Sequence, residues 1–380
     1  MSQLKVNTIR HTSASSDAIT LASDGTAAIG ECTAKITNNL SNRNLIINGD
    51  FKIAQRGTSS TAVGYGSVDR WKVNFGGTDE AVTHAQHALT SSDTGPWAKG
   101  FRYSLHLTNG DQTSGAGAAD YIEVDQEIEA QDIVQSGWDY TSASSYVTLS
   151  FWIKSSVAQN FYGYLRVNDN TKQLYCIETG SLSANTWVKV TKTIPGAANN
   201  NIDNDNGAGI LLRLLPFYGT DNTGTRPLNA WAAYDSAART PDNTSTWYTT
   251  DDATFEITGV QLEVGDTATD YEHRKYSQEL IECQRYYEEI SQHEVGGMPV
   301  AIGQGFNTRK GLGYINFKVT KRAAPTAPDV SIGIDQGDTS HTCEFSTTTS
   351  GTIVKSGSST DIGNADITTG AWTGKFSAEL

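Results

Sequence analysis

The sequence has 380 residues, and its 28 lysines and arginines stand against 42 aspartates and glutamates, giving a formal net charge of −14. This excess of acid argues against a nucleic-acid binder. Glycine is frequent at 36 residues, methionine occurs twice, and charged residues make up only 18%. Such a composition is typical of short strands joined by polar turns, so we predict a mainly β protein.

Residues 1–43 form a distinct first segment. Short strands are expected in LKVNTIR and in AITLASDGTAAIG, with a turn at Asp24-Gly25. The segment has too few apolar residues to fold alone. We therefore expect it to need a partner, either identical copies of itself or a docking surface on a larger assembly.

Residues 44–272 have the pattern of a β-sandwich or jelly roll, with about nine strands between NLIINGDF and ATFEITGVQLEV. The clearest strand is YVTLSFWIKS, in which Val147, Leu149, Phe151 and Ile153 fall on one face. Trp152 falls on the other face, where it is either core or an exposed platform. Trp71, at a strand start, is expected to pack in the core.

A long polar stretch at 216–253 exceeds the usual connection of about 4–6 residues and is rich in rings. A pyranose is recognised by a flat apolar ring beside hydrogen-bonding groups. The aromatic candidates for glycan contact are Tyr218, Trp231, Tyr234, Trp247 and Tyr248 in this loop and Trp97 in DTGPWAKG. We rank Trp231 and Trp247 highest. The alternative is that these rings pin the loop to the sandwich.

A helix is predicted over 273–292, followed by a small β module at 293–380. The helix carries an apolar seam at 4-3-4-3 spacing, formed by Tyr276, Leu280, Cys283, Tyr287 and Ile290. The seam fits packing on the chain's own sandwich and packing on symmetry mates equally well. The four cysteines have no CxxC spacing, so neither a disulfide framework nor a zinc site is predicted.

Two groups of sequence segments resemble a known family. LKVNTIRHTSASSDAITLASDGTAAIG is similar to the N-terminal segment of tail-fibre and virion structural proteins of marine tailed bacteriophages. NLIINGDFKIAQRGTS, VDRW and FEITGVQLEVGDTATDYEHRKYSQELIECQRYYEE resemble a phage tail-fibre module, a carbohydrate-binding-like jelly roll closed by a strand and a helix. The resemblance covers residues 4–30 and 44–290.

The resemblance implies a homotrimer of the virion tail, made in the host cytoplasm. Residues 1–43 would attach it to other tail proteins, and the distal β domains would face host cell-surface polysaccharide. We expect no insertion into a membrane and no export by the general secretory route, because the sequence has neither a membrane-spanning run nor a signal peptide.

Carbohydrate-binding jelly rolls often hold a calcium ion near the first strand. Here Lys52 stands at the position of a ligand carboxylate, so Asp50, Asp252 and Glu263 are weak candidates, and we expect no metal and no cofactor.

Sequence signals for catalysis are poor. There is no HExxH, GxSxG or Walker motif, and His84 and His87 would point to opposite faces of a strand. We therefore expect a glycan-binding protein without catalysis. Two alternatives stay open: an architectural virion protein without receptor contact, and a polysaccharide depolymerase using paired carboxylates.

Overall fold

The computed structural model describes residues 42–243 and 246–290 fully. It also describes 316–325, 347–350 and 375–380, and the backbone of further strands within 1–41 and 291–374. The protein is mainly β, as predicted. The chain divides into two compact units, Met1–Ser41 and Asn42–Leu380. Among the described residues, no helix combines the length and the apolar character needed to span a membrane.

The first unit contains a small antiparallel sheet. Its strands are β1 (Thr8–Ile9), β2 (Ile19–Leu21) and β3 (Ala27–Ile29), in the order β1-β2-β3. Both segments that were predicted to contain strands do so. The requirement of this segment for a partner stays a prediction.

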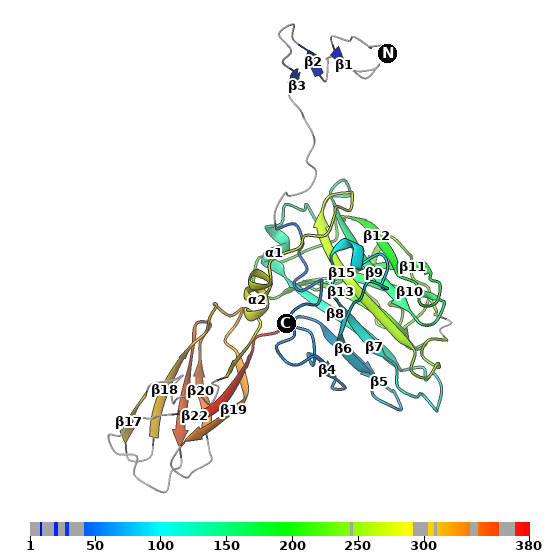
Figure 1. The fold of residues 1–380 in the computed structure, drawn as a ribbon. Coiled ribbons are helices and arrows are strands. Elements are labelled where there is room, and N and C mark those ends of the chain that lie inside the picture. Colours follow the sequence, from blue (N-terminus) through cyan, green and yellow to red (C-terminus); the bar gives the residue numbers. More distant parts are fainter. Residues whose placement is uncertain are drawn as a thin grey trace. The chain divides into compact units, whose positions relative to one another are not determined.

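Two six-stranded antiparallel sheets form the sandwich of the second unit (Figure 1). The first, named the β8 sheet, has the order β14-β11-β10-β13-β8-β5. Its strands are β14 (Trp231–Ala233), β11 (Gln173–Ser181), β10 (Asn160–Val167), β13 (Ala208–Tyr218), β8 (Tyr121–Glu129) and β5 (Lys72–Gly76). The second, named the β9 sheet, has the order β12-β9-β15-β7-β6-β4. Its strands are β12 (Val188–Pro195), β9 (Tyr146–Ser155), β15 (Thr254–Val264), β7 (Tyr103–Thr108), β6 (Thr83–Ala88) and β4 (Ser59–Ser60).

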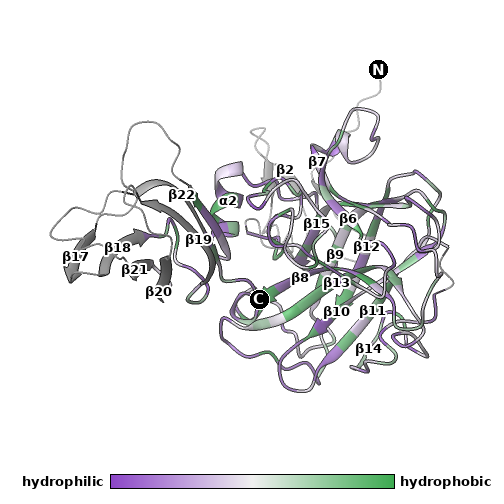
Figure 2. Cartoon of the chain, turned by 90° about the horizontal axis from the view of Figure 1, so that it is seen from below, coloured by the Kyte–Doolittle hydropathy of each residue, from purple (hydrophilic) through white to green (hydrophobic). Residues whose placement is uncertain are grey.

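The core lies between the two sheets and follows the period-2 alternation of the strands. In β9, the predicted apolar face from Val147 to Ile153 is buried in this core. Trp71 is also fully buried and packs on Phe51, with ring centroids 5.1 Å apart, so its structural role is confirmed. Hydrophilic and hydrophobic residues both occur along the strands of the sandwich (Figure 2), as expected for strands whose two faces differ.

The expected strand in NLIINGDF does not form. Residues 44–51 run irregularly along β15 and are held by isolated hydrogen bonds, such as the one from Leu45 N–H to the Leu262 carbonyl. Asn48 has a φ of 57°, and a Cβ at Gly49 would come within 2.1 Å of the Val260 carbonyl oxygen. The Asn-Gly pair thus makes a turn that brings the backbone against β15, which interrupts strand pairing.

The predicted helix is shorter than expected. α2 spans Tyr276–Gln284, and the chain then enters β16 (Tyr287–Ser291), which pairs with β22 (Thr369–Ser377). This pairing with a distant segment overrides the helical pattern. The prediction of a continuous helical seam is therefore wrong, since Tyr287 and Ile290 lie in a strand.

The seam residues do not share one surface. Cys283 and Tyr287 are buried within the chain, Leu280 and Ile290 are half-buried, and Tyr276 is 60% exposed. Of the two alternatives, the burial of Cys283 and Tyr287 fits packing within the chain.

Strands after α2 form two small sheets. One has the order β16-β22-β19, with β19 (Thr326–Ile334) at its edge, as expected for a strand containing proline. The other has the order β17-β18-β21-β20. Its strands are β17 (Gly303–Asn307), β18 (Lys310–Asn316), β21 (Ser350–Ser356) and β20 (His341–Ser346).

The last residues of the chain bind residues of the sandwich segment. The Glu379 carboxylate pairs with the buried Arg70 guanidinium and lies 3.1 Å from Arg56. The Arg70 and Arg56 guanidiniums stack on the rings of Tyr286 and Tyr287, at 3.4 and 3.6 Å from the ring centroids. The residues that follow α2 therefore complete a packed cluster around two arginines.

Candidate functional site

A polar pocket of about 400 Å³ lies on the outer face of the β8 sheet. It is built by outward-facing positions of β5, β8, β10 and β13 and by the long connection between β13 and β15. The lining residues are Asn74, Ala119, Tyr121, Glu123, Arg166, Arg213, Asp221, Asn222, Tyr234 and Arg239. We refer to this site as the β8 pocket.

The floor of the β8 pocket is an ionic network centred on Arg213. Its guanidinium donates from Nε and Nη2 to the Asp125 carboxylate at 2.6 and 2.5 Å, and from Nη1 to Glu123 at 2.6 Å. Glu123 and Asp125 are two residues apart on β8, so the strand alternation directs both to this face. The bidentate contact fixes the plane of the guanidinium.

A second arginine and a tyrosine surround Glu123. The Tyr218 hydroxyl donates to its carboxylate at 2.5 Å, and Arg239 lies 3.5 Å from the same oxygen. Burial raises the pKa of Glu123; Arg213 opposes this and the neighbouring Asp125 adds to it, so the net direction is upward. The network holds donors and acceptors in fixed directions at the base of the pocket.

Two tyrosines form walls of the β8 pocket. Tyr121 lies across Gly76, where an added Cβ would come within 2.8 Å of its ring. Tyr234 comes from the long loop, and the Arg166 guanidinium stands 5.1 Å from its ring centroid. Both tyrosines are half-buried, so each keeps part of its ring open to solvent. Rings beside fixed polar groups are suited to a polyhydroxylated ligand with one apolar face.

The predicted glycan-contact residues have separate positions. Tyr234 alone of the six lies in the wall of the β8 pocket, while Tyr218 is buried beneath it with 2% of its surface exposed. Trp247 and Tyr248 are fully buried; the Tyr248 ring stacks on Phe217 at 4.0 Å. For these three buried side chains the prediction of surface contact is wrong, and the alternative of pinning the loop holds.

The two other predicted tryptophans are half-buried but not in this pocket. The Trp231 ring packs edge-on against Tyr175, and its Nε1 donates to the Pro195 carbonyl at 2.6 Å. Trp97 lies in the short helix η1 (Trp97–Lys99), where Arg102 covers its ring at 3.8 Å. Both rings are used in intramolecular packing.

A second, smaller hollow of about 250 Å³ lies on the outer face of the β9 sheet. Trp152 is half-buried in its lining, beside Phe101, Tyr271 and Lys189. Trp152 is therefore not part of the core, and the structure gives it a partly open ring. This hollow lacks the rigid ionic floor of the β8 pocket but offers an indole platform.

Two of the three residues considered for calcium, Asp50 and Glu263, have other partners, and the third, Asp252, is exposed. Lys52 Nζ lies 2.9 Å from the Asp50 carboxylate and donates to the Arg274 carbonyl. Glu263 accepts bonds from the Thr269 N–H and hydroxyl, at 2.8 and 2.6 Å. The ammonium of Lys52 thus supplies the positive charge next to Asp50.

Sequence reasoning missed most of the β8 pocket, including Arg213, Glu123, Asp125, Tyr121 and Arg166. A signal was present: Arg213 is the only charged residue in AGILLRLLPFY, and an acid stands at every second position of YIEVDQEIE from Glu123 on. A lone charge in an apolar strand requires a buried partner. The partner strand, however, is not visible in the sequence.

The strand order defines this part of the chain as a two-sheet antiparallel sandwich of the jelly-roll type. No family model matches the chain, and no curated protein matches it.

Among solved structures, the enzymatically active domain of bacteriophage CBA120 tailspike protein 4 is similar over 58% of this chain and 21% of its own, with 14% identity and a TM-score of 0.30. The N-terminal cellulose-binding domain of Cellulomonas fimi β-1,4-glucanase C is similar over 57% of this chain and 99% of its own, with 12% identity and a TM-score of 0.27.

The CBM22-1 xylan-binding domain of a Paenibacillus barcinonensis protein is similar over 59% of this chain and 96% of its own, with 12% identity and a TM-score of 0.28. The match thus spans about a fifth of the tailspike structure and nearly all of the two binding domains. Because these TM-scores are low, the sandwich is assigned from the strand order of this chain and not from the similar structures.

Proposed function

We propose that this protein binds carbohydrate in the β8 pocket without cleaving it, as part of the tail of a tailed bacteriophage. The observation that carries the proposal is the combination of two half-open tyrosine rings with a rigid ionic floor around Arg213. The rings cover the apolar face of a sugar, and the fixed donors and acceptors bond its hydroxyls.

Rigidity supports binding over other uses of such a charged cluster. Arg213 is held by two carboxylates and also donates to the Tyr164 hydroxyl at 3.0 Å. A sugar that replaces water here meets groups that are already ordered, so little side-chain entropy is lost on binding. The half-buried Arg166 and Tyr234, at the rim, are available to close on the ligand.

The place in the tail is proposed from the sequence resemblance. Residues 1–43 would attach the chain to other tail proteins, and a homotrimer would present three weak sugar sites at once, which raises attachment by avidity. The mass of the full chain in solution, by light scattering with dilution, tests the trimer. A monomer at all concentrations would contradict it.

Binding can be measured with the full chain and polysaccharide extracted from candidate bacterial host cells, with a parallel assay for new reducing ends. Tyr234→Ala and Arg166→Ala should each weaken binding by about fivefold or more. Tyr103→Ala, a substitution of an exposed tyrosine on β7, is the matched control and should leave binding unchanged.

The hollow on the β9 sheet, with Trp152 in its lining, is the alternative position for the sugar site, and substitutions in the two sites distinguish them. Loss of binding in Trp152→Ala, with Tyr234→Ala unaffected, would move the site to the β9 sheet and overturn the β8 pocket as the sugar site. Absence of saturable binding to any extract would instead favour an architectural virion protein.

A depolymerase is the second candidate, favoured by one observation. Glu123 and Asp125 form a carboxylate pair, and the raised pKa of Glu123 is a property of a general acid. The Arg213 guanidinium binds both carboxylates, and this argues against a catalytic role for the pair. Release of reducing ends that disappears in Glu123→Gln would establish cleavage and overturn the non-catalytic proposal.

A further inference from the structure

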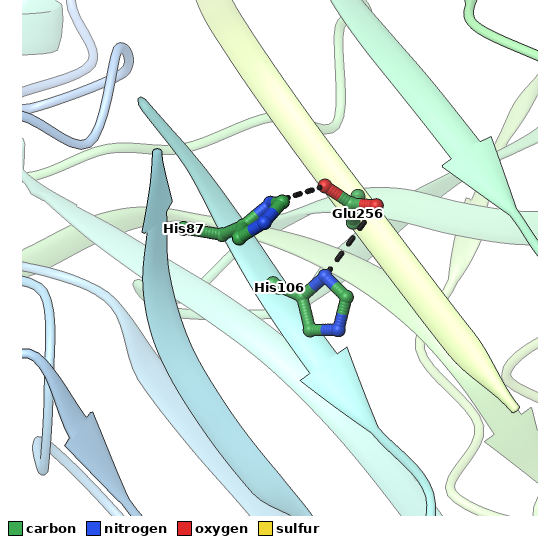
Figure 3. Close-up of side chains that lie close together, drawn as sticks. All are labelled: His87, His106 and Glu256. Carbon is green, nitrogen blue, oxygen red and sulfur yellow. Dashed lines mark hydrogen bonds and ion pairs between the residues drawn. The ribbon is translucent and has the colours of Figure 1, made fainter. Parts of the chain in front are cut away.

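Two histidines and a glutamate meet on the outer face of the β9 sheet, apart from the β8 pocket. His87 is on β6, His106 on β7 and Glu256 on β15 (Figure 3). The strand register explains the meeting: His106 is directly opposite Glu256, and His87 is opposite Ser104, two residues before His106. The diagonal neighbours therefore point to the same face.

The donor atoms of the three side chains converge. Nδ1 of His87 lies 3.2 Å from Oε2 of Glu256, and Nδ1 of His106 lies 3.4 Å from Oε1. All three ligand atoms lie within 4.8 Å of one another. Zinc–ligand bonds of about 2.0–2.1 Å place the ligands of a tetrahedral site about 3.3 Å apart. Small side-chain rotations would thus complete a three-ligand site.

The burial of the three groups suits an open metal site. Glu256 is 2% exposed, His106 is half-buried and His87 is exposed, so the carboxylate forms the base and the solvent side stays accessible. Nδ1 of His106 is buried without a hydrogen bond among the described residues. This nitrogen faces the Glu256 carboxylate at 3.4 Å, beyond the usual hydrogen-bond length, so it is in position to bind an ion held between the two groups.

We propose that His87, His106 and Glu256 bind a divalent transition-metal ion, Zn²⁺ in the first instance. Imidazole and carboxylate are ligands that suit zinc, and three protein ligands leave a fourth position for water. The site is independent of carbohydrate binding, since it uses the other sheet. It was hidden in the sequence because its ligands come from three strands spread over 170 residues.

Lys154 is the feature that limits the affinity. Its ammonium lies 2.8 Å from Oε1 of Glu256 and 3.1 Å from Asp93. A neighbouring cation repels Zn²⁺, so the metal binds most readily when Lys154 remains on Asp93 alone. The Asp93 carboxylate is well placed to hold the Lys154 ammonium, because a hydrogen bond from Trp187 Nε1 at 3.0 Å fixes its position. Removing the lysine charge should therefore strengthen metal binding.

The test is titration of the chelator-treated full chain with Zn²⁺ in competition with a chromophoric chelator. His87→Ala and His106→Ala should each reduce the affinity by about tenfold or more, since even outer-shell partners of a metal ligand contribute roughly 10- to 100-fold. His273→Ala removes an imidazole outside the cluster and should leave the affinity unchanged.

Two further measurements keep the proposal falsifiable if a histidine variant folds poorly. Co²⁺ added to the native protein should give the visible absorption of a nitrogen- and oxygen-ligated ion. Lys154→Gln should bind Zn²⁺ about tenfold more tightly than the native chain, because a positive charge next to the site is removed. Equal Zn²⁺ affinity in the native chain, both histidine variants and Lys154→Gln, or no binding at all, would overturn the site.

Discussion

The outer faces of the two sheets each carry a buried glutamate, and the two glutamates differ in their partners. Glu123 on the β8 sheet shares one guanidinium with Asp125. Glu256 on the β9 sheet accepts bonds from Ser104 and Lys154, lies next to the rings of His87 and His106, and shares Lys154 with Asp93. Burial raises the pKa of Glu256, but contacts with His106 and Lys154 outweigh it and lower the pKa to about 2.

The difference teaches that burial alone does not decide the charge state of a carboxyl group on a sheet face. Both side chains lose water, yet the pKa of Glu123 rises and that of Glu256 falls. At Glu123 the loss of water and the neighbouring Asp125 outweigh the arginines, whereas at Glu256 the contacts with His106 and Lys154 outweigh the loss of water, although Asp93 also pairs with Lys154. The proposed ligands of the two faces differ as well, a hydroxyl-rich sugar for the β8 sheet and a metal ion for the β9 sheet.

The largest expected effect is the loss of Arg213. Arg213→Met leaves Glu123 and Asp125 buried without their cation, and it should lower the free energy of unfolding by about 3–5 kcal/mol. Urea denaturation measures this. Arg166→Met, at the rim of the same pocket, should cost less than about 1 kcal/mol. Equal effects of the two substitutions would show that Arg213, in the floor of the pocket, contributes no more to the free energy of unfolding than Arg166 at the rim.

The Glu256 network predicts a pH-dependent loss. A carboxyl group whose pKa is lower in the folded state than in the unfolded state stabilises the protein at pH values above the unfolded pKa. This stabilisation is lost as the pH falls toward the folded-state pKa of about 2. Glu256→Gln should therefore cost about 3 kcal/mol at pH 7 and progressively less below about pH 4.5. Asp270→Asn, an exposed acid, is the control for urea denaturation at each pH.

Glu123 should show the opposite sign. Because its pKa is raised in the folded state, its contribution to stability is fully present below the unfolded pKa and is lost as pH rises through the folded value. The native chain should therefore gain stability relative to Glu123→Gln as the pH is lowered from 7 to 4. A change in the same direction as for Glu256→Gln would contradict the contrast between the two faces.

The smallest effect concerns the attachment of the long loop to the β8 sheet. The Tyr248 hydroxyl donates to Asp120, just before β8, at 2.9 Å. Tyr248→Phe removes this buried bond and should cost about 1 kcal/mol in urea denaturation. Tyr103→Phe, at an exposed tyrosine, should change stability little. No measurable loss in Tyr248→Phe would mean that this hydrogen bond does not contribute to the attachment of the loop.

Local patterns in the sequence were sufficient for the fold class and for many strands. Strand alternation depends on the geometry of neighbouring residues, so the buried face of β9 could be assigned from YVTLSFWIKS alone. The same holds for the opposite orientations of His84 and His87, which pair with Leu107 and Ser104. The core position of Trp71 was also correct.

Tertiary contacts decided the features that depend on distant segments. α2 ends at Gln284 because residues 287–291 pair with β22 some 80 residues later in the chain. Trp247 and Tyr248 are buried because the loop folds back onto the sandwich, although their surroundings in the sequence are polar. Arg213 meets Glu123 and Asp125 across β13 and β8, nearly 90 residues apart. Periodicity shows which face of a strand a residue occupies, but only strand order and register decide which residues meet there.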